Sequence, residues 1–195
     1  MRNRFDRQLV QLNNELIEMG GMIEKAISDT VKALVNQDIE LASNVIEYDE
    51  EIDHQEREIE QLCLKLLLQQ QPVAKDLRLI SAALKMITDM ERIGDQAADI
   101  ADIVKVTSLD VPDASIRLKD MAKATASMVT KCIDAYVKQD LKLAREVIDS
   151  DDIVDDLFDE VKDEILQGMR KGITTDVQSL DSVSYTHLTL PTNSR

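Results

Sequence analysis

The sequence predicts an all-α protein made of two tandem three-helix bundles, and three observations support this fold class. The 195 residues include only 5 glycines, 3 prolines and 3% aromatic residues, so turns and strand formers are scarce. Apolar residues recur every three or four positions over stretches of about 30 residues, which is the pattern of long amphipathic helices. The first half of the chain also recurs in the second half as an internal repeat.

The first half of the chain contains three predicted helices. The first spans Phe5–Asn36, and Asp38 is placed to cap the start of the next. The second spans Ile39–Gln70 and ends before Pro72, because proline breaks a helix interior but suits a first turn. The third spans Val73–Val106. Since the connection between the second and third helices is short, these two should form an antiparallel hairpin.

The second half begins after a linker. Leu109–Asp113, which contains a proline, is the clearest linker in the chain. Two further helices are predicted at Ser115–Lys138 and Leu141–Met169. The apolar pattern of the first of these is weak, so its assignment depends on the repeat.

The repeat is visible in one ungapped register, 102 positions apart. The matching pairs are Gln37-Asp38 with Gln139-Asp140, Leu41-Ala42 with Leu143-Ala144, Val45-Ile46 with Val147-Ile148, Asp49 with Asp151, and Ile52-Asp53 with Val154-Asp155. The helices Ser115–Lys138 and Leu141–Met169 are therefore the counterparts of the first two helices. We assign residues 1–108 to the first repeat, 109–113 to the linker and 114–183 to the second repeat.

We expect the second repeat to lack its last helix. The counterpart of the third helix's acidic motif would fall at the very end of the chain, where nothing resembles it. Thr174–Ser182 could open a sixth helix. Residues 184–195 are rich in threonine and resemble a translated sequencing-adapter tail, so we expect them to be non-native and give them no function.

Charge and hydropathy exclude several classes of function. The formal net charge is −15, from 38 acidic and 23 basic residues, which argues against binding to nucleic acid or to anionic lipid. No apolar run reaches the roughly 20 residues that span a bilayer, and no signal peptide is evident. The two cysteines, Cys63 and Cys132, are far apart and typical of buried, reduced thiols. We expect a cytoplasmic protein that is peripheral to a membrane at most.

The most informative stretch is Thr88–Asp102. Four apolar residues precede it on one helical face: Leu77, Ile80, Leu84 and Ile87. The next positions on that face are Glu91 and Gly94, and Asp95 follows Glu91 one turn later. Because desolvating a charge costs several kcal/mol, two carboxylates on a partly buried face need a cation, a proton or strong hydrogen-bond donors.

The second helix carries a matching acidic pair. Asp49 and Asp95 lie equally far on either side of Pro72, and so do Asp53 and Glu91. In an antiparallel hairpin both pairs should therefore be level, about 30 Å from the turn. Four carboxylates from two helices form a site for a hard ion such as iron, manganese, magnesium or calcium. The alternative is a solvated acidic stripe without metal.

These residues also resemble a known family. The motifs DEEID at 49–53 and ERIGD at 91–95, with QDIELASNVIEYDEEID before and QDLKLAREVIDSDDIVDDL after the linker, resemble the PhoU family of phosphate-uptake regulators. The resemblance implies two three-helix bundles and metal clusters held by paired acidic motifs. It assigns Asp49, Asp53, Glu91 and Asp95 to the first cluster. Asp151 and Asp155 become half of a second cluster, whose other half has no counterpart here.

The resemblance also implies a function. Members of the family contact the ATPase of a phosphate ABC transporter and a membrane sensor histidine kinase. They repress phosphate-starvation signalling when phosphate is plentiful, and they are not regarded as enzymes. It also implies a homodimer and bound iron or manganese, with magnesium as a further candidate.

Two alternatives remain open at this level. A carboxylate-bridged di-metal enzyme would use two Glu-x-x-His motifs, and Glu51–His54 is one literal match. The other histidine is His187, in the suspected tail, so the second motif cannot be built. A metal-free helical adaptor would share the fold but bind no metal. The sequence offers no candidate catalytic residue.

Overall fold

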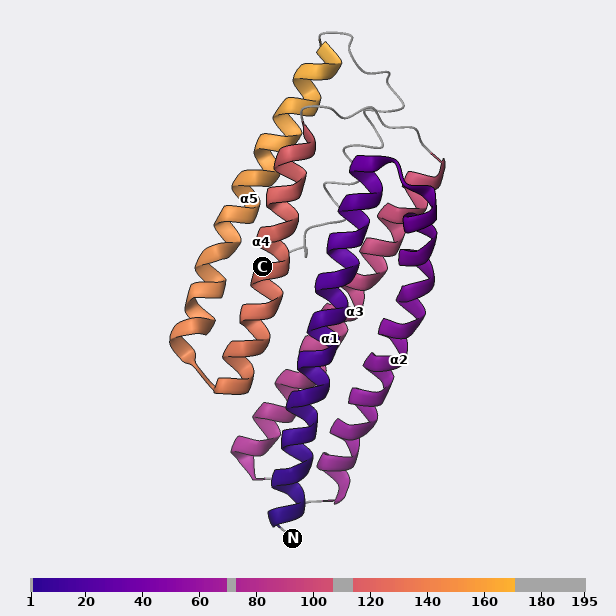
Figure 1. The fold of residues 1–195 in the computed structure, drawn as a ribbon. Coiled ribbons are helices and arrows are strands. Elements are labelled where there is room, and N and C mark those ends of the chain that lie inside the picture. The colour runs from indigo at the N-terminus through magenta and orange to yellow at the C-terminus, as the bar shows by residue number, and fades with distance from the viewer. Residues whose placement is uncertain (1, 70–72, 107–113, 171–195) are drawn as a thin grey trace.

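The computed structural model describes residues 2–69, 73–106 and 114–170, and every regular element in these ranges is an α-helix (Figure 1). The helices are α1 (Arg2–Asn36), α2 (Ile39–Gln69), α3 (Ala74–Val106), α4 (Ala114–Lys138) and α5 (Leu141–Arg170). They match the five predicted helices to within a few residues at each end. The predictions for the linker, for the sixth helix and for the tail fall outside the described residues. None of the described helices is long and apolar enough to cross a membrane.

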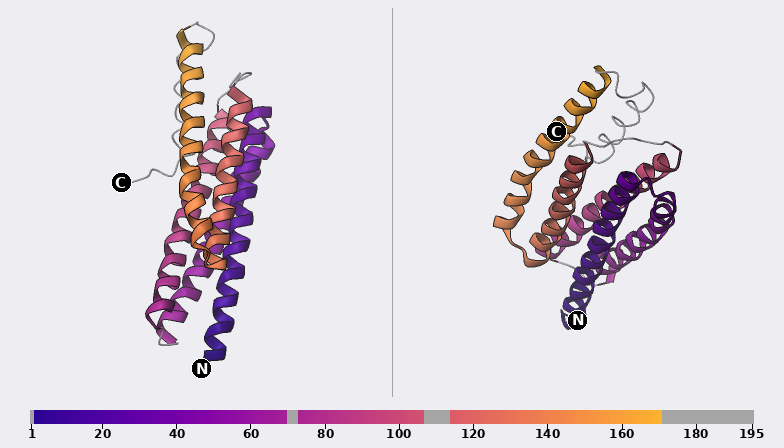
Figure 2. Two further views of the ribbon diagram at one scale, coloured as in Figure 1. Left: turned by 90° about the vertical axis from the view of Figure 1, so that its left-hand side faces the viewer. Right: turned by 45° about the horizontal axis from the view of Figure 1, so that its top comes forward.

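The helices form two groups joined through α1. Helices α1, α2 and α3 pack against one another as a three-helix bundle, while α4 and α5 form a helical hairpin (Figures 1 and 2). Helix α4 lies against α1, and α5 lies on the outer side of α4 (Figure 2). The first predicted bundle is thus complete, and the first two helices of the second bundle are arranged like their counterparts.

The two interhelical turns confirm the repeat. Gln37 and Gln139 both have a positive φ of 52°, which is uncommon outside glycine. After each of them an aspartate caps the next helix. The Asp38 carboxylate accepts a hydrogen bond from the backbone N–H of Leu41 at 2.9 Å, and Asp140 accepts one from Leu143 at 3.1 Å. The predicted cap at Asp38 is therefore confirmed, and it recurs 102 positions later.

The core face of α3 differs from the prediction by about one position. The buried residues include Ile80, Ala83, Ile87, Met90, Gly94 and Ala97. The predicted face therefore holds only for Ile80, Ile87 and Gly94. Leu77 is exposed, and Leu84 and Glu91 are only half buried. Because α3 packs against both α1 and α2, its buried face is wider than one stripe and centred on Met90.

Small side chains set the distances between helices. A Cβ atom added to Gly20 would meet the side chain of Ile133 on α4, so this glycine allows the two halves of the protein to approach closely. Gly21 has nothing within 4 Å of such an atom.

The two cysteines differ in exposure, because Cys63 is buried and Cys132 is exposed. The prediction of two buried thiols is therefore wrong for Cys132, which lines an open cavity between α3, α4 and α5.

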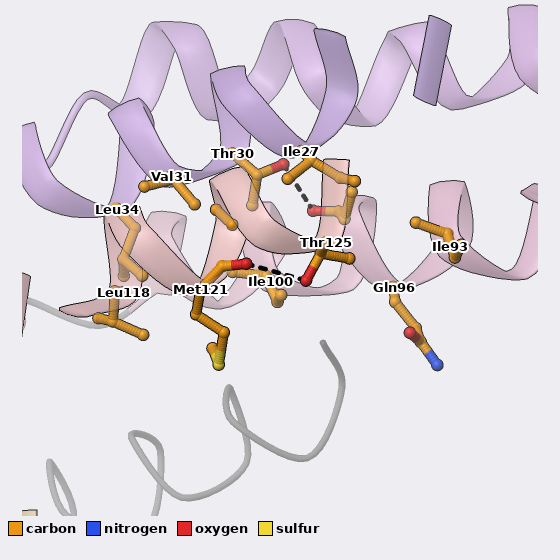
Figure 3. Close-up of a pocket in the computed structure, with 12 residues that line it drawn as sticks. Ile27, Thr30, Val31, Leu34, Ile93, Gln96, Ile100, Leu118, Met121 and Thr125 are labelled. Atoms are coloured by element: carbon orange, nitrogen blue, oxygen red, sulfur yellow. Dashed lines mark hydrogen bonds between the residues drawn. The ribbon is translucent and has the colours of Figure 1, made fainter. Parts of the chain in front are cut away.

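A small apolar pocket of about 50 Å³ lies where α1, α3 and α4 meet (Figure 3). Two buried threonines that line this pocket each donate a hydrogen bond to a carbonyl four residues earlier in the same helix. The Thr30 hydroxyl donates to the carbonyl of Ala26 at 2.8 Å and approaches that of Ala97 on α3 at 3.3 Å, and Thr125 donates to Met121 at 3.0 Å. This pocket is part of the packing between the two halves, and none of the described residues that line it is charged.

Candidate metal centre

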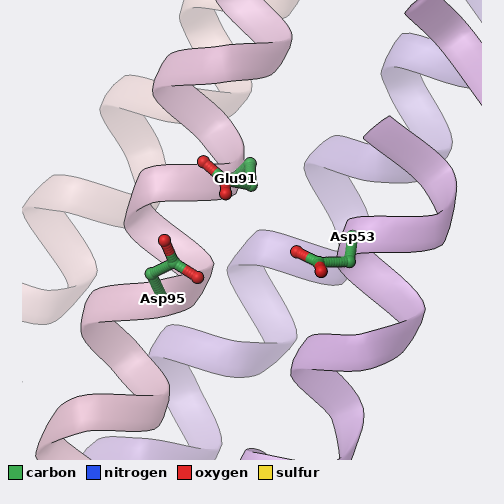
Figure 4. A group of neighbouring side chains, drawn as sticks. All are labelled: Asp53, Glu91 and Asp95. Atoms are coloured by element: carbon green, nitrogen blue, oxygen red, sulfur yellow. The ribbon is translucent and has the colours of Figure 1, made fainter. Parts of the chain in front are cut away.

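Three carboxylates meet on the face shared by α2 and α3. Asp53 comes from α2, while Glu91 and Asp95 come from α3, and one oxygen atom from each lies within 4.8 Å of the other two (Figure 4). Asp53 and Glu91 are half buried and Asp95 is exposed. The level arrangement inferred from equal distances to Pro72 is therefore present in the structure.

Asp49 lies beside this group, one turn before Asp53. Its Oδ1 atom is buried and has no hydrogen-bond partner among the described residues. It lies 3.0 Å from the position of a Cβ atom built on Gly94, so the absence of a side chain at Gly94 is what lets this carboxylate rest against α3. A buried carboxylate oxygen without a donor is costly, and a bound cation would compensate it.

The electrostatics of the four carboxylates show the same excess of negative charge. Burial first, and then the charges of Asp95, Asp53 and Asp99, together raise the pKa of Asp49 to about 6. The pKa values of Glu91 and Asp95 are also raised, in both cases first by burial and then by neighbouring carboxylates. A nearby divalent cation would lower all three pKa values, because it favours the charged forms.

Only one cation of the described residues forms an ion pair with these carboxylates. The Arg57 Nη2 atom lies 3.2 Å from Asp53 Oδ2, and both side chains are substantially exposed. Exposed pairs of this kind contribute little to stability. The four acidic groups, which we call the α2–α3 acidic cluster (Asp49, Asp53, Glu91 and Asp95), are thus left largely uncompensated. Their oxygen donors fit a hard metal ion.

Two further acids belong to this face and were not among the predicted ligands. Asp99 lies one turn after Asp95, and its charge raises the pKa of both Asp49 and Asp95. Glu56 lies on α2, and its own pKa is raised by burial and by Glu60 and Asp53. The spacing of Asp99 from Asp95 was visible in the sequence and could have indicated the longer stripe.

Asp151 and Asp155 lie elsewhere, on α5. Asp151 is half buried and lines an apolar cavity of about 200 Å³ between α3, α4 and α5, which Asp89 also lines. Asp155 is exposed, and its pKa is raised by slight burial and by Asp151 and other acids of α5. The structure therefore does not join these two residues to the α2–α3 acidic cluster.

The Glu-x-x-His match does not contribute to the cluster. Glu51 is exposed, and the His54 side chain is 72% exposed, with its Nε2 atom 3.8 Å from Glu58. Neither residue lies on the face that α2 shares with α3. The di-metal enzyme alternative thus has no support among the described residues.

Comparison with known proteins identifies the family. The sequence model of the PhoU domain family matches residues 16–104 and again residues 118–189. The two matches begin 102 positions apart, which is also the spacing of the internal repeat. The chain belongs to the PhoU family. The internal duplication is thus a duplication of the PhoU domain, and the α2–α3 acidic cluster lies within the first copy.

Several PhoU proteins are similar over most of this chain. The "Phosphate-specific transport system accessory protein PhoU homolog" of Clostridium acetobutylicum is 40% identical over 156 residues, covering 79% of this chain and 71% of that protein. The homolog of Pseudomonas aeruginosa is 35% identical over 154 residues, covering 78% and 64%. The chain thus spans about two thirds of the length of these relatives.

Solved PhoU structures share the fold. The crystal structure of PhoU from Pseudomonas aeruginosa has a TM-score of 0.86 at 30% identity, covering 95% of this chain and 90% of that one. The phosphate transport system regulatory protein PhoU from Streptococcus pneumoniae has a TM-score of 0.84 at 25% identity, covering 95% and 88%. The predicted all-α fold of tandem PhoU bundles is confirmed.

The raised pKa of Asp49 predicts how stability depends on pH. The folded-state pKa of about 6 lies above the ordinary 3.8, so the protonated form is favoured in the folded state. This contribution to stability is complete below about pH 4 and is lost as the pH rises through about 6. We therefore expect the metal-free protein to melt at a higher temperature at about pH 5 than at about pH 7.5.

Thermal unfolding by circular dichroism in the presence of a chelator measures this difference. Asp49→Asn should melt higher than the parent at about pH 7.5 and should show a smaller change between the two pH values. A parent protein that melts higher at neutral pH, or an Asp49→Asn protein with the full pH dependence, would contradict the assignment.

Proposed function

We propose that this chain is a regulator of phosphate uptake that acts by binding other proteins. Its partners would be the ATPase of a phosphate ABC transporter and a membrane sensor histidine kinase, and it would repress phosphate-starvation signalling when phosphate is plentiful. It would act in the cytoplasm as a homodimer, without catalysing a reaction. The names of its relatives support this proposal, because they describe accessory proteins of the phosphate-specific transport system and a regulatory protein.

The structural feature that best supports a regulatory role is the α2–α3 acidic cluster. Asp49, Asp53, Glu91 and Asp95 would hold a hard metal ion, with iron or manganese as the first candidates and magnesium as a further one. The orphaned Asp49 oxygen and the raised pKa values of three of the four groups fit such an ion. Asp151 and Asp155 would contribute to a second site on α5.

The ion would supply a structural and electrostatic function. Because the ligands come from both α2 and α3, it would tie the two helices together about 30 Å from their turn. It would also neutralise a strongly acidic face and so determine which charge a partner meets there. Arg57, which is paired with Asp53, would adjust its position when the ion binds.

A repression assay tests the proposal. A bacterium lacking its own PhoU protein would carry this chain, or this chain extended after Ser182 by a final helix. A phosphatase reporter is then read in high phosphate. We expect repression by at least the extended chain, and loss of repression in its Asp53→Asn/Glu91→Gln variant.

The control for this assay is the variant Glu50→Gln/Asp102→Asn, in which two exposed acids of the same helices are neutralised. It should repress like the parent. If neither chain represses although both accumulate as folded protein and bind the host transporter ATPase, the regulatory proposal is wrong. If all variants repress equally, the chain is a regulator, but the α2–α3 acidic cluster has no part in the repression.

A further inference from the structure

A basic groove lies between α1 and α4, away from the acidic face of α2 and α3. It measures about 630 Å³ and has an apolar floor that includes Ile27 and Val31. Among the described residues, four lysines line it: Lys32, Lys119, Lys123 and Lys131. We call it the α1–α4 lysine groove. A concentration of positive charge at one place is unexpected in a chain whose formal net charge is −15.

The lysines follow a regular line along α4. Lys119, Lys123 and Lys131 occupy positions spaced by four or eight residues, with Ser127 in the remaining place. Residues four apart lie on one face of a helix, so these side chains form a row about 18 Å long. Lys32 of α1 lines the opposite side of the groove.

The positive charge of the groove is only partly compensated. Lys32 pairs with Asp29 at 2.9 Å and Lys123 with Asp120 at 3.7 Å, each within its own helix. Lys119 and Lys131 are exposed, and no carboxylate of the described residues lies within ion-pair distance of either. Like charges one helical turn apart, as at Lys119 and Lys123, repel each other, so an anionic occupant would be stabilising.

Among the described residues that line the groove, Glu24 is the one acid. The Thr130 hydroxyl of α4 donates to the Ala126 carbonyl at 3.1 Å and lies 3.5 Å from the Glu24 carboxylate of α1, a distance at which a hydrogen bond is weak. The remaining lining residues are small or polar, such as Ala122, Ala126 and Ser28. The surface therefore combines a narrow apolar floor with cationic edges.

We propose that the α1–α4 lysine groove binds an acidic segment of a partner protein. In an extended segment, alternate side chains would point to the apolar floor and to the lysines, and a row of about 18 Å accommodates about five residues. Lysines are flexible point charges, suited to carboxylates in varied positions rather than to one rigid phosphate geometry. Long polyanions and anionic membranes are disfavoured by the charge of the whole chain. The inference is independent of the metal site and of the partners proposed above.

Fluorescence anisotropy with a labelled peptide of alternating glutamate and leucine tests this directly, using the purified full chain. The peptide should bind the parent protein, and Lys119→Glu/Lys131→Glu should weaken binding by at least about tenfold. The matched control is Lys75→Glu/Lys105→Glu, which reverses two exposed charges on α3, outside the groove, and alters net charge equally. It should bind like the parent, and circular dichroism should show both variants folded.

Three results would overturn the inference. The first is absence of binding to the parent, or an equal loss in both variants, which would mean that net charge alone governs binding. The second is binding of inorganic phosphate through the same lysines when the peptide does not bind, which would make the groove a small-anion site. The third is self-association of the parent that Lys119→Glu/Lys131→Glu abolishes, which would make a second copy the occupant.

Discussion

The variant Asp53→Asn/Glu91→Gln is expected to bind manganese more than about 100-fold less tightly than the parent, because even changes to residues that only orient ligands cost 10- to 100-fold. The two substitutions remove one carboxylate from each helix and preserve side-chain shape. Titration with Mn²⁺, followed by the electron paramagnetic resonance signal of the free ion, measures the affinity and stoichiometry.

The same variant should be more stable than the parent when both are metal-free. The pKa of Glu91 is raised by burial and by neighbouring carboxylates, so its charged form destabilises the folded state at neutral pH. A gain in melting temperature together with a loss of metal binding is a combination that general misfolding would not produce.

The control is Glu50→Gln/Asp102→Asn, which removes two exposed acids from the same two helices. Both proteins lose the same formal charge, so nonspecific attraction of cations falls equally. Unchanged manganese affinity in Asp53→Asn/Glu91→Gln, or an equal loss in the control, would contradict a metal site at the α2–α3 acidic cluster.

Gly94→Leu should destabilise the protein by at least about 2 kcal/mol, because the new side chain has no space between α2 and α3. Its Cβ atom would lie 3.0 Å from Asp49 Oδ1 and 3.1 Å from two carbon atoms of Ile52. Ile52 is only 1% exposed and cannot move aside without displacing its neighbours. The two helices would have to separate, so metal affinity should fall together with stability.

Gly21→Leu is the matched control for this substitution. Gly21 also lies within a helix, but nothing lies within 4 Å of a Cβ atom there. Replacing an unconstrained helical glycine should stabilise the protein by about 0.8 kcal/mol. Thermal unfolding should therefore shift by roughly 4–8 °C downward for Gly94→Leu and slightly upward for Gly21→Leu. Two shifts in the same direction would refute the close contact at Gly94.

Much of the fold was predictable because the chain is almost entirely helical. Long amphipathic stretches with few glycines and prolines leave little choice of element, and aspartates such as Asp38 mark helix starts through local hydrogen bonds. The repeat added independent information, since it aligned Ser115–Lys138, whose own apolar pattern is weak, with the strongly patterned helix Phe5–Asn36. The contacts of α4 and α5 with the rest were not predictable, because they depend on tertiary packing at residues such as Gly20 and Ile133.

The buried face of α3 shows where periodicity alone is insufficient. The stripe through Leu77, Leu84 and Glu91 and the stripe through Ala83, Met90 and Ala97 both follow helical spacing. The larger aliphatic side chains favoured the first stripe. The second stripe lies at the centre of the buried face of α3, because small residues let the neighbouring helices approach α3 closely, as Gly94 does for α2.

The proximity of the α2 and α3 carboxylates was predictable from the sequence, and their energetics were not. Equal distances from Pro72 were enough to bring Asp53 and Glu91 together. The orphaned oxygen of Asp49 and its raised pKa depend on how closely α2 approaches Gly94, which no spacing rule gives. Asp99 was missed because the pairing considered only two acids on each helix.

X-ray anomalous scattering from a crystal grown with Mn²⁺ tests the central claim most directly. The account predicts a peak between α2 and α3, with carboxylate oxygens from both helices within about 2.5 Å of the ion and Asp53 and Glu91 among the ligands. Absence of a peak there at saturating manganese, or a peak held by one helix alone, would contradict it.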